Sequence, residues 1–108
     1  MSQNIYTTIC YFGTNIEKNG IISRVSKTNW RWFVNKHIVD KINSFTISSN
    51  IGYWNSKKEL TYTLTIIHPE DPQIMDKLIE IGKEYKQLYN QDEVIINTTK
   101  NFNFIGIN

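Results

Sequence analysis

The sequence predicts an α+β fold, in which a four-stranded antiparallel sheet carries two helices on one face. Three observations support this: short segments rich in β-branched and aromatic residues, two longer segments with helical apolar spacing, and turn residues between them. The expected order is strand, helix, strand, strand, helix, strand, over residues 4–12, 27–41, 45–54, 59–68, 72–89 and 93–99. This β-α-β-β-α-β order predicts a ferredoxin-like sandwich that forms a single domain, residues 1–108.

The first strand, NIYTTICYF, ends at Gly13. A loop, or a short hairpin turned at Asn19-Gly20, follows, because this dipeptide favours tight turns between strands. Alternate residues of a strand point to opposite faces of its sheet. The sequence leaves open which set faces away from the helices: Tyr6, Thr8, Cys10 and Phe12, or Thr7, Ile9 and Tyr11.

The first helix is expected to begin after Ser26, a residue type that caps helix N-termini. Val25 before the cap and Trp30 after it have the spacing of a hydrophobic staple. Trp30 opens an apolar stripe that continues through Phe33, Val34, His37 and Ile38. Trp32 lies roughly 200° from Trp30 around the helix, so we expect it to face outward as an interface residue.

The strand ELTYTLTIIH has the clearest alternation, with its leucines, Tyr62 and Ile66 expected to meet the helices. Pro69 stops it, and Asp71-Pro72 is a cap followed by proline for the second helix. The tail, residues 101–108, is expected to add an edge strand or to dock on a neighbouring subunit through Phe102 and Phe104.

The sheet face away from the helices is expected to present hydroxyl groups, from Thr61, Thr63, Thr65, Thr46 and Ser48. Hydroxyls donate and accept hydrogen bonds, so this face suits a polar ligand. It equally suits sheet-to-sheet dimerisation, or is a wetted face of ordinary strand-forming residues.

The chain resembles an uncharacterised bacterial family, domain of unknown function three-five-seven-four. The resemblance spans most of residues 6–98 and rests on short motifs: Tyr11-Phe12-Gly13, Val25-Ser26 with Trp30 and Phe33-Val34, Phe45-Thr46-Ile47, Gly52 with Trp54, Ile67-His68-Pro69 with Asp71, Tyr85-Lys86, and Gln91 with Glu93-Val94. It implies a ferredoxin-like fold and carries no established chemistry. In the family pattern an acidic residue often stands where this chain has Asn29, and members are commonly exported.

Charge is divided along the chain. Residues 1–58 hold eight lysines and arginines against two acidic residues, whereas residues 59–108 hold four against eight. Either copies of the chain attract one another, or the basic half faces an anionic ligand. Arg24 and Lys27, together with Tyr53 and Trp54, combine positive charge with aromatic rings and are candidate contacts for a base and a phosphate.

His68, at a strand end before a helix N-terminus, is the candidate general base if the protein is an enzyme, with Tyr11 as its companion. His37 lies on the buried stripe and is expected to be structural. Cys10 lies mid-strand without a neighbouring histidine, which argues against a catalytic thiolate. With two distant histidines and one cysteine, neither a metal site nor a bound cofactor is expected.

The chain contains no alanine and many residues with AT-rich codons, which points to a low-GC bacterium or a bacteriophage. Its first residues lack an apolar signal segment, and the single cysteine fits a reducing compartment, so we expect a cytoplasmic protein (of the host, if phage-encoded).

These observations favour a non-enzymatic module that sequesters a polar, anionic or nucleotide-like small molecule as a homo-oligomer, for example a phage anti-defence sponge. The expected ligand-binding residues are Tyr6, Thr8, Tyr11, Arg24, Lys27, Tyr53, Trp54, Thr63 and His68. The alternatives are a small dimeric α+β-barrel enzyme (an isomerase, lyase or monooxygenase) using His68, and a structural or protein-binding oligomer. Nucleic acid and membrane partners are not expected, because the net charge is only +2 and no long apolar run exists.

Overall fold

The computed structural model describes residues 4–108. The strands are β1 (Ile5–Gly13), β2 (Asn15–Lys18), β3 (Ile21–Arg24), β4 (Thr46–Trp54), β5 (Lys57–Pro69) and β6 (Ile95–Asn101). The helices are α1 (Lys27–Phe33), its π-helical continuation η1 (Val34–Ile38), and α2 (Pro72–Tyr89). None of the helices in this part of the chain has the length and hydropathy needed to span a membrane.

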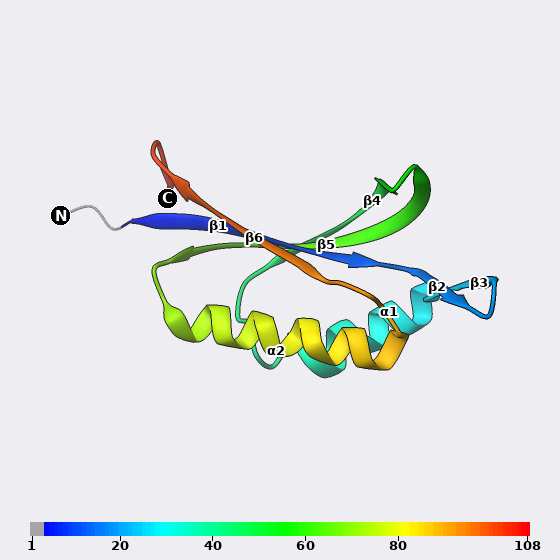
Figure 1. The fold of residues 1–108 in the computed structure, drawn as a ribbon. Helices are drawn as coiled ribbons and strands as arrows, with labels where there is room; N and C mark the ends of the chain where they lie inside the picture. Colours follow the sequence, from blue (N-terminus) through cyan, green and yellow to red (C-terminus); the bar gives the residue numbers. More distant parts are fainter. Residues whose placement is uncertain (1–3) are drawn as a thin grey trace.

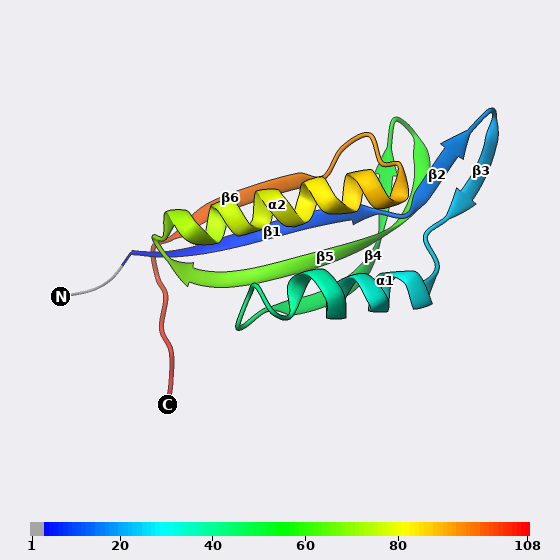
Figure 2. The same cartoon turned by 90° about the horizontal axis from the view of Figure 1, so that it is seen from below.

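The main sheet is antiparallel, with strand order β4-β5-β1-β6. Both helices cover the same face, which leaves the other face open (Figure 1). Seen from below, α2 runs along β1 and β6 while α1 lies over β4 and β5 (Figure 2). The predicted ferredoxin-like α+β fold is therefore confirmed.

The register of β1 settles which of its residues face the helices. Thr8, Cys10 and Phe12 are buried and lie opposite Ile66, Leu64 and Tyr62 of β5. The even-numbered set therefore points into the core, and Thr7, Ile9 and Tyr11 point to the open face. This placement puts Tyr6, Thr8 and Tyr11, all expected ligand contacts, on two different faces of the sheet.

Aromatic side chains fill the core at the end of the sheet near Gly13. The Trp30 ring stacks on the Tyr62 ring with centroids 4.5 Å apart and planes 4° apart. Phe12 lies 5.2 Å from Trp30 and 4.9 Å from Tyr85, between ring centroids. Offset and edge-to-face pairs of this kind add stability beyond the area they bury.

Helix α1 begins as predicted, because the Ser26 side chain accepts a hydrogen bond from the Asn29 backbone amide. Its expected α-helical course to Lys41 is wrong: from Val34 the chain forms a π-helix, in which the Val39 amide donates to the Val34 carbonyl. The wider turn keeps Ile38 fully buried while the His37 ring stacks on Phe33.

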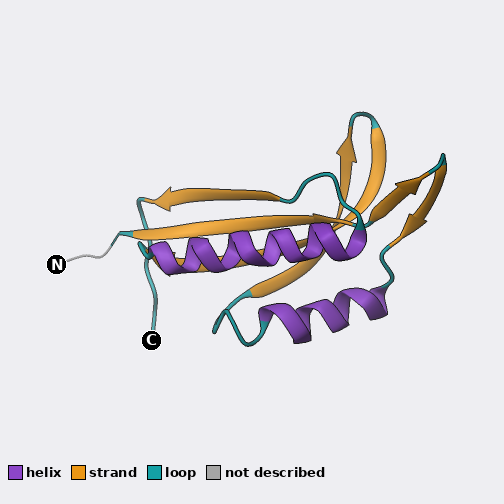
Figure 3. Cartoon of the chain, turned by 60° about the horizontal axis from the view of Figure 1, so that its bottom comes forward, coloured by secondary structure: helices purple, strands orange, loops and turns teal. Residues whose placement is uncertain are grey.

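The segment after β1 is the expected hairpin, formed by β2 and β3 and turned at Asn19 and Gly20, both with positive φ. This hairpin projects past the helices at the same end as the β4–β5 turn (Figure 3). Helix α2 has the predicted Asp71 cap and ends at Asn90 in a left-handed conformation.

The tail does not add an edge strand, so that alternative is wrong. β6 ends at Asn101, which pairs with Ile5, the first residue of β1. β1 begins at Ile5, so no residue of β1 lies beyond this pair. Phe102 is 87% exposed, and Phe104 is also exposed.

One ion-pair cluster links the two helices: Lys41 and His37 both contact the Glu84 carboxylate. Burial disfavours the ionised form of Glu84, but hydrogen bonds and charge from Lys41 and His37 outweigh it, so the pKa of Glu84 lies below its ordinary value of 4.5. A carboxyl with a lowered folded-state pKa adds stability above its unfolded pKa, and this is lost as pH falls through the folded value.

Acidification below about pH 4.5 is therefore expected to lower the free energy of unfolding of both the wild type and the Glu84→Gln variant. The decrease is expected to be larger in the wild type, by up to about 1 kcal/mol. Urea unfolding of both proteins at about pH 6 and about pH 3.5 measures the difference. Equal losses in the two proteins would contradict this role of Glu84.

Candidate functional site

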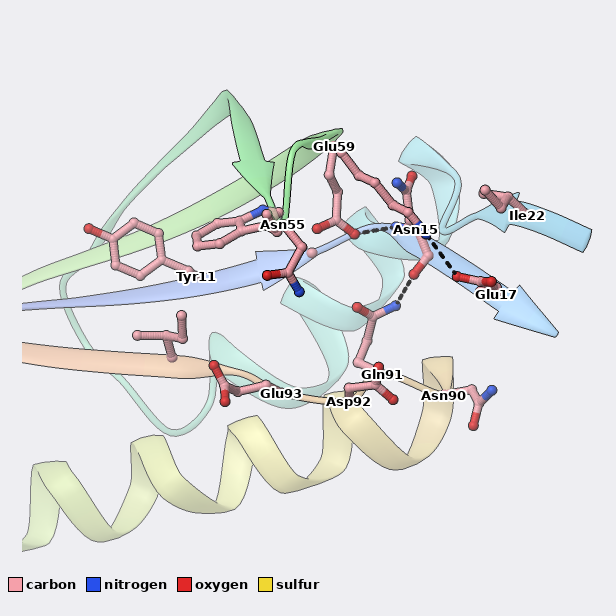
Figure 4. Close-up of a pocket in the computed structure, with 14 residues that line it drawn as sticks. Tyr11, Asn15, Glu17, Ile22, Asn55, Glu59, Asn90, Gln91, Asp92 and Glu93 are labelled. Carbon is pink, nitrogen blue, oxygen red and sulfur yellow. Dashed lines mark hydrogen bonds and ion pairs between the residues drawn. The ribbon is translucent and has the colours of Figure 1, made fainter. Parts of the chain in front are cut away.

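A cleft of about 380 Å³ opens at the end of the molecule where the two hairpins project. We call it the acidic cleft. Its walls are the β2–β3 hairpin, the β4–β5 turn, the end of β1 and the loop after α2 (Figure 4). It is lined by Tyr11, Gly13, Asn15, Glu17, Ile22, Trp54, Asn55, Lys57, Glu59, Asn90, Gln91, Asp92, Glu93 and Ile95. Its volume is in the usual range for small-molecule sites.

Glu59 crosses over the end of β1 and is held there. Its Oε2 accepts a 2.7 Å hydrogen bond from the Asn15 amide. Gly13 makes the crossing possible, since a Cβ at this position would lie 2.8 Å from both carboxylate oxygens. The Gly13 carbonyl in turn accepts a 2.6 Å hydrogen bond from the Tyr85 hydroxyl. Glu59 thus reaches the cleft from a fixed position.

The acidic cleft carries a net negative charge. Four carboxylates line it, from Glu17, Glu59, Asp92 and Glu93, against one lysine, Lys57. The Lys57 Nζ lies 3.7 Å from the Glu17 Oε2. The loop lining the cleft follows the C-terminus of α2, and helix C-termini carry a partial negative charge. The cleft therefore favours a positively charged ligand.

Two further features suit a ligand with a planar ring and polar edges. Tyr11 and Trp54 line the cleft, and the Trp54 indole donates to the Thr61 hydroxyl over 3.4 Å. Asn15 presents a buried side-chain oxygen that has no hydrogen-bond partner among the described residues. Gln91 fixes the loop by donating to the Asn15 carbonyl over 2.9 Å.

His68 lies at the opposite end of the sheet, beside the start of α2. It is 5% exposed and faces the helices, in a shallow pocket with Tyr6 and Met75. Its Nδ1 is 2.7 Å from the Pro69 carbonyl and its Nε2 is 2.6 Å from the Thr8 hydroxyl. Because a carbonyl only accepts, Nδ1 donates and Nε2 accepts from Thr8. Both ring nitrogens are hydrogen-bonded, so the ring of His68 is held in one orientation.

We expect His68→Ala to lower the free energy of unfolding by about 1–3 kcal/mol, because the buried Thr8 hydroxyl loses its acceptor. Chemical denaturation monitored by circular dichroism measures this loss. Unchanged stability accompanied by loss of a turnover would instead support a catalytic His68.

Cys10 is a buried core residue. Burial raises the pKa of its thiol to about 12, so the thiol stays protonated at neutral pH. Within residues 4–108, no three histidine, cysteine, aspartate or glutamate side chains are grouped as a metal site would need.

The structure separates the other expected contacts. Thr63 faces the open side of the sheet, where its hydroxyl is hydrogen-bonded to Ser48 and Asn50. Arg24 ends β3 and Lys27 begins α1, both outside the residues that line the cleft. Tyr53 is exposed and also lies outside it. Tyr11 and Trp54 are the expected contacts that meet in the acidic cleft.

Sequence reasoning missed the carboxylates of the cleft. Glu59 shares the strand face of Thr61 and Thr63, but it was not among the expected ligand contacts. Asp92 and Glu93 follow α2 directly. No local pattern, however, brings these residues to the β2–β3 hairpin, which is contributed by a distant segment.

Comparison with known proteins places the chain in a family. Residues 7–104 match the family described as "Protein of unknown function (DUF3574)". The chain belongs to this family. The resemblance found in the sequence motifs is thereby confirmed. None of the curated proteins compared with the chain is similar to it in sequence.

Solved structures share the fold of this DUF3574 member. A phage SAM lyase in complex with S-methyl-5'-thioadenosine has a TM-score of 0.59 at 14% identity, covering 93% of this chain and 84% of that chain. The de novo designed protein Foldit4 has a TM-score of 0.54 at 16% identity, covering 90% of this chain and 97% of that chain. At such identities the likeness shows a common fold, and fold alone does not specify function.

Proposed function

We propose that the protein binds a positively charged, nucleoside-like small molecule in the acidic cleft. The observation that carries this proposal is the make-up of the cleft: Tyr11 and Trp54 beside four carboxylates and one lysine. Aromatic faces stack on bases and attract cations, and carboxylates pair with a cationic centre. Of the ligand classes suggested by the sequence, the cleft favours a nucleoside and disfavours an anion, because its carboxylates repel negative charge.

The fold likeness to a phage SAM lyase that holds S-methyl-5'-thioadenosine adds a chemical class to test. S-adenosylmethionine combines a nucleoside with a sulfonium cation, and S-methyl-5'-thioadenosine is a neutral thioether with the same nucleoside.

Isothermal titration calorimetry with three compounds tests the proposal. We expect S-adenosylmethionine to bind at least tenfold more tightly than S-methyl-5'-thioadenosine, about 1.4 kcal/mol, because only the former carries the sulfonium charge. ATP, which keeps the adenosine but adds negative charge, is expected to bind most weakly. Raising the salt concentration is expected to weaken S-adenosylmethionine most.

Tighter binding of ATP than of S-adenosylmethionine would contradict the proposal, as would binding of none of the three. Equal affinity for S-adenosylmethionine and S-methyl-5'-thioadenosine would support recognition of the nucleoside but would contradict a role of the positive charge.

Sequestration remains our first proposal for what binding achieves, in the manner of a phage sponge in the host cytoplasm. A lyase is the second candidate, favoured by the fold neighbour that carries this activity. Mass spectrometry after incubation with S-adenosylmethionine distinguishes them. Intact ligand recovered on denaturation supports sequestration, whereas time-dependent appearance of S-methyl-5'-thioadenosine supports a lyase.

A further inference from the structure

Three rows of the open face hold no charged residue, whereas Glu59 and Lys57 lie on the same face of β5 beyond these rows, toward the β4–β5 turn. Paired strands place directly opposite residues on the same face, so the register defines this face. Its rows run from β4 through β5 and β1 to β6: Thr46, Thr65, Ile9 and Asn97 in one row, and Ser48, Thr63, Tyr11 and Ile95 in the next. A third row, which β4 does not reach, contains Ile67, Thr7 and Thr99.

This composition is unusual for a face left to water. One residue in five of the chain is charged, so eleven such positions would carry about two charges, and solvated sheet faces are normally polar. Here isoleucine, threonine, asparagine and tyrosine alternate instead, and Ile67 is 58% exposed. Depletion of charge with retained apolar and aromatic residues is typical of the centre of a protein interface.

The molecule also exposes more surface than a compact monomer of its size. Its accessible surface is 7785 Å², against about 6,200 Å² expected for 12.7 kDa. Its radius of gyration is 15.2 Å, against about 13 Å expected. This excess, roughly 1,600 Å², belongs to the whole molecule, and a standard interface, which buries about 800 Å² of each partner, would remove about half of it.

The elongated parts border the open face and cover part of it, since Thr61 and Thr63 on this face are buried. The β4–β5 hairpin and the C-terminal segment both turn to the side away from the helices (Figure 1). The helical side is a poorer candidate for association, because the exposed part of α2 carries charged residues such as Glu80 and Asp76.

We propose that the open face packs against the same face of a second copy of this chain. An uncharged surface meets itself about a two-fold axis without like-charge repulsion, and two sheets stack face to face at about 10 Å. Tyr11 and Ile95 belong both to the open face and to the acidic cleft, so the second copy also borders the cleft. The association itself does not depend on any ligand.

Sedimentation equilibrium of the full chain without ligand tests this. The wild type is expected at twice the monomer mass of 12.7 kDa. Ile67→Lys places a lysine in each facing sheet and is expected to give the monomer mass. The matched control is Ile79→Lys, which changes an exposed isoleucine on α2 and is expected to keep the wild-type mass.

Circular dichroism confirms that each variant is folded, and Thr99→Glu, at an exposed position of β6 on the same face, replaces Ile67→Lys if that variant unfolds. A wild type that is monomeric at sub-millimolar concentration overturns the proposal. So does association that survives both Ile67→Lys and Thr99→Glu.

Discussion

Trp30→Ala is expected to lower the free energy of unfolding by about 3–5 kcal/mol, the largest effect of any variant considered for this protein. Trp30 is 4% exposed, stacks on Tyr62 and contacts Phe12, Phe33 and Tyr85. Removing it leaves a cavity that the surrounding rings, themselves held by β1, β5 and α2, cannot fill. A domain of this size has about 5–15 kcal/mol in total, so the variant loses a large part of its stability.

Urea unfolding measures the loss, and each kcal/mol corresponds to roughly 4–8 °C in melting temperature. Trp32→Ala is the matched control, since it removes the same side chain two positions along the same helix. Trp32 is 49% exposed and makes an edge contact with His37, so its loss is expected to cost less than about 1 kcal/mol. Similar losses in the two variants would refute the separation of a buried and an outer tryptophan.

Local sequence patterns were sufficient to predict most of the helices and strands. The Ser26 and Asp71 caps, the Asn19-Gly20 turn and the alternation of β5 each act within a few residues, and each appears in the structure. The π-helix after Val34 was missed, because the apolar spacing of this segment fits an α-helix; in the structure His37 stacks on Phe33 and pairs with Glu84 of α2. Helical spacing alone carries no information about that partner.

The face of β1 was undecidable for a different reason. Both of its alternating sets mix threonine with aromatic residues, so burial could not be assigned from composition. Pairing with β5 decides it, and that pairing also places the Thr8 hydroxyl on His68, a residue 60 positions away. A histidine that looked available as a base in the sequence is thereby fixed by two hydrogen bonds.

The distribution of charge along the chain also did not predict the charge of the cleft. The excess of lysine and arginine in the first half favoured an anionic ligand, but charge along a sequence is not charge in space. Folding brings Glu59 and the Asp92-Glu93 pair of the second half to Asn15 and Glu17 of the first. The cleft that results is acidic, and its sign follows from topology.

The second large effect is expected on ligand binding. The double variant Glu59→Gln and Glu93→Gln is expected to weaken binding of the cationic nucleoside about tenfold to a hundredfold, because each carboxylate–cation contact contributes about 1.5–3 kcal/mol before screening by solvent. Glutamine keeps an oxygen that accepts from the Asn15 amide, so the position over Gly13 is retained while the charge is removed. The neutral thioether, which lacks the cationic centre, is expected to lose less than about threefold.

Calorimetry of both compounds with wild type and double variant separates charge from structure. Glu80→Gln on α2 is the matched control: it removes one carboxylate that pairs with Lys41, outside the residues lining the cleft, and is expected to change neither affinity. Equal weakening of the cation and of the thioether would mean that Glu59 and Glu93 only shape the cleft. Because the cation's advantage is electrostatic, it must also shrink in the wild type as salt is added, and in the double variant, which keeps Glu17 and Asp92, this salt dependence must be weaker.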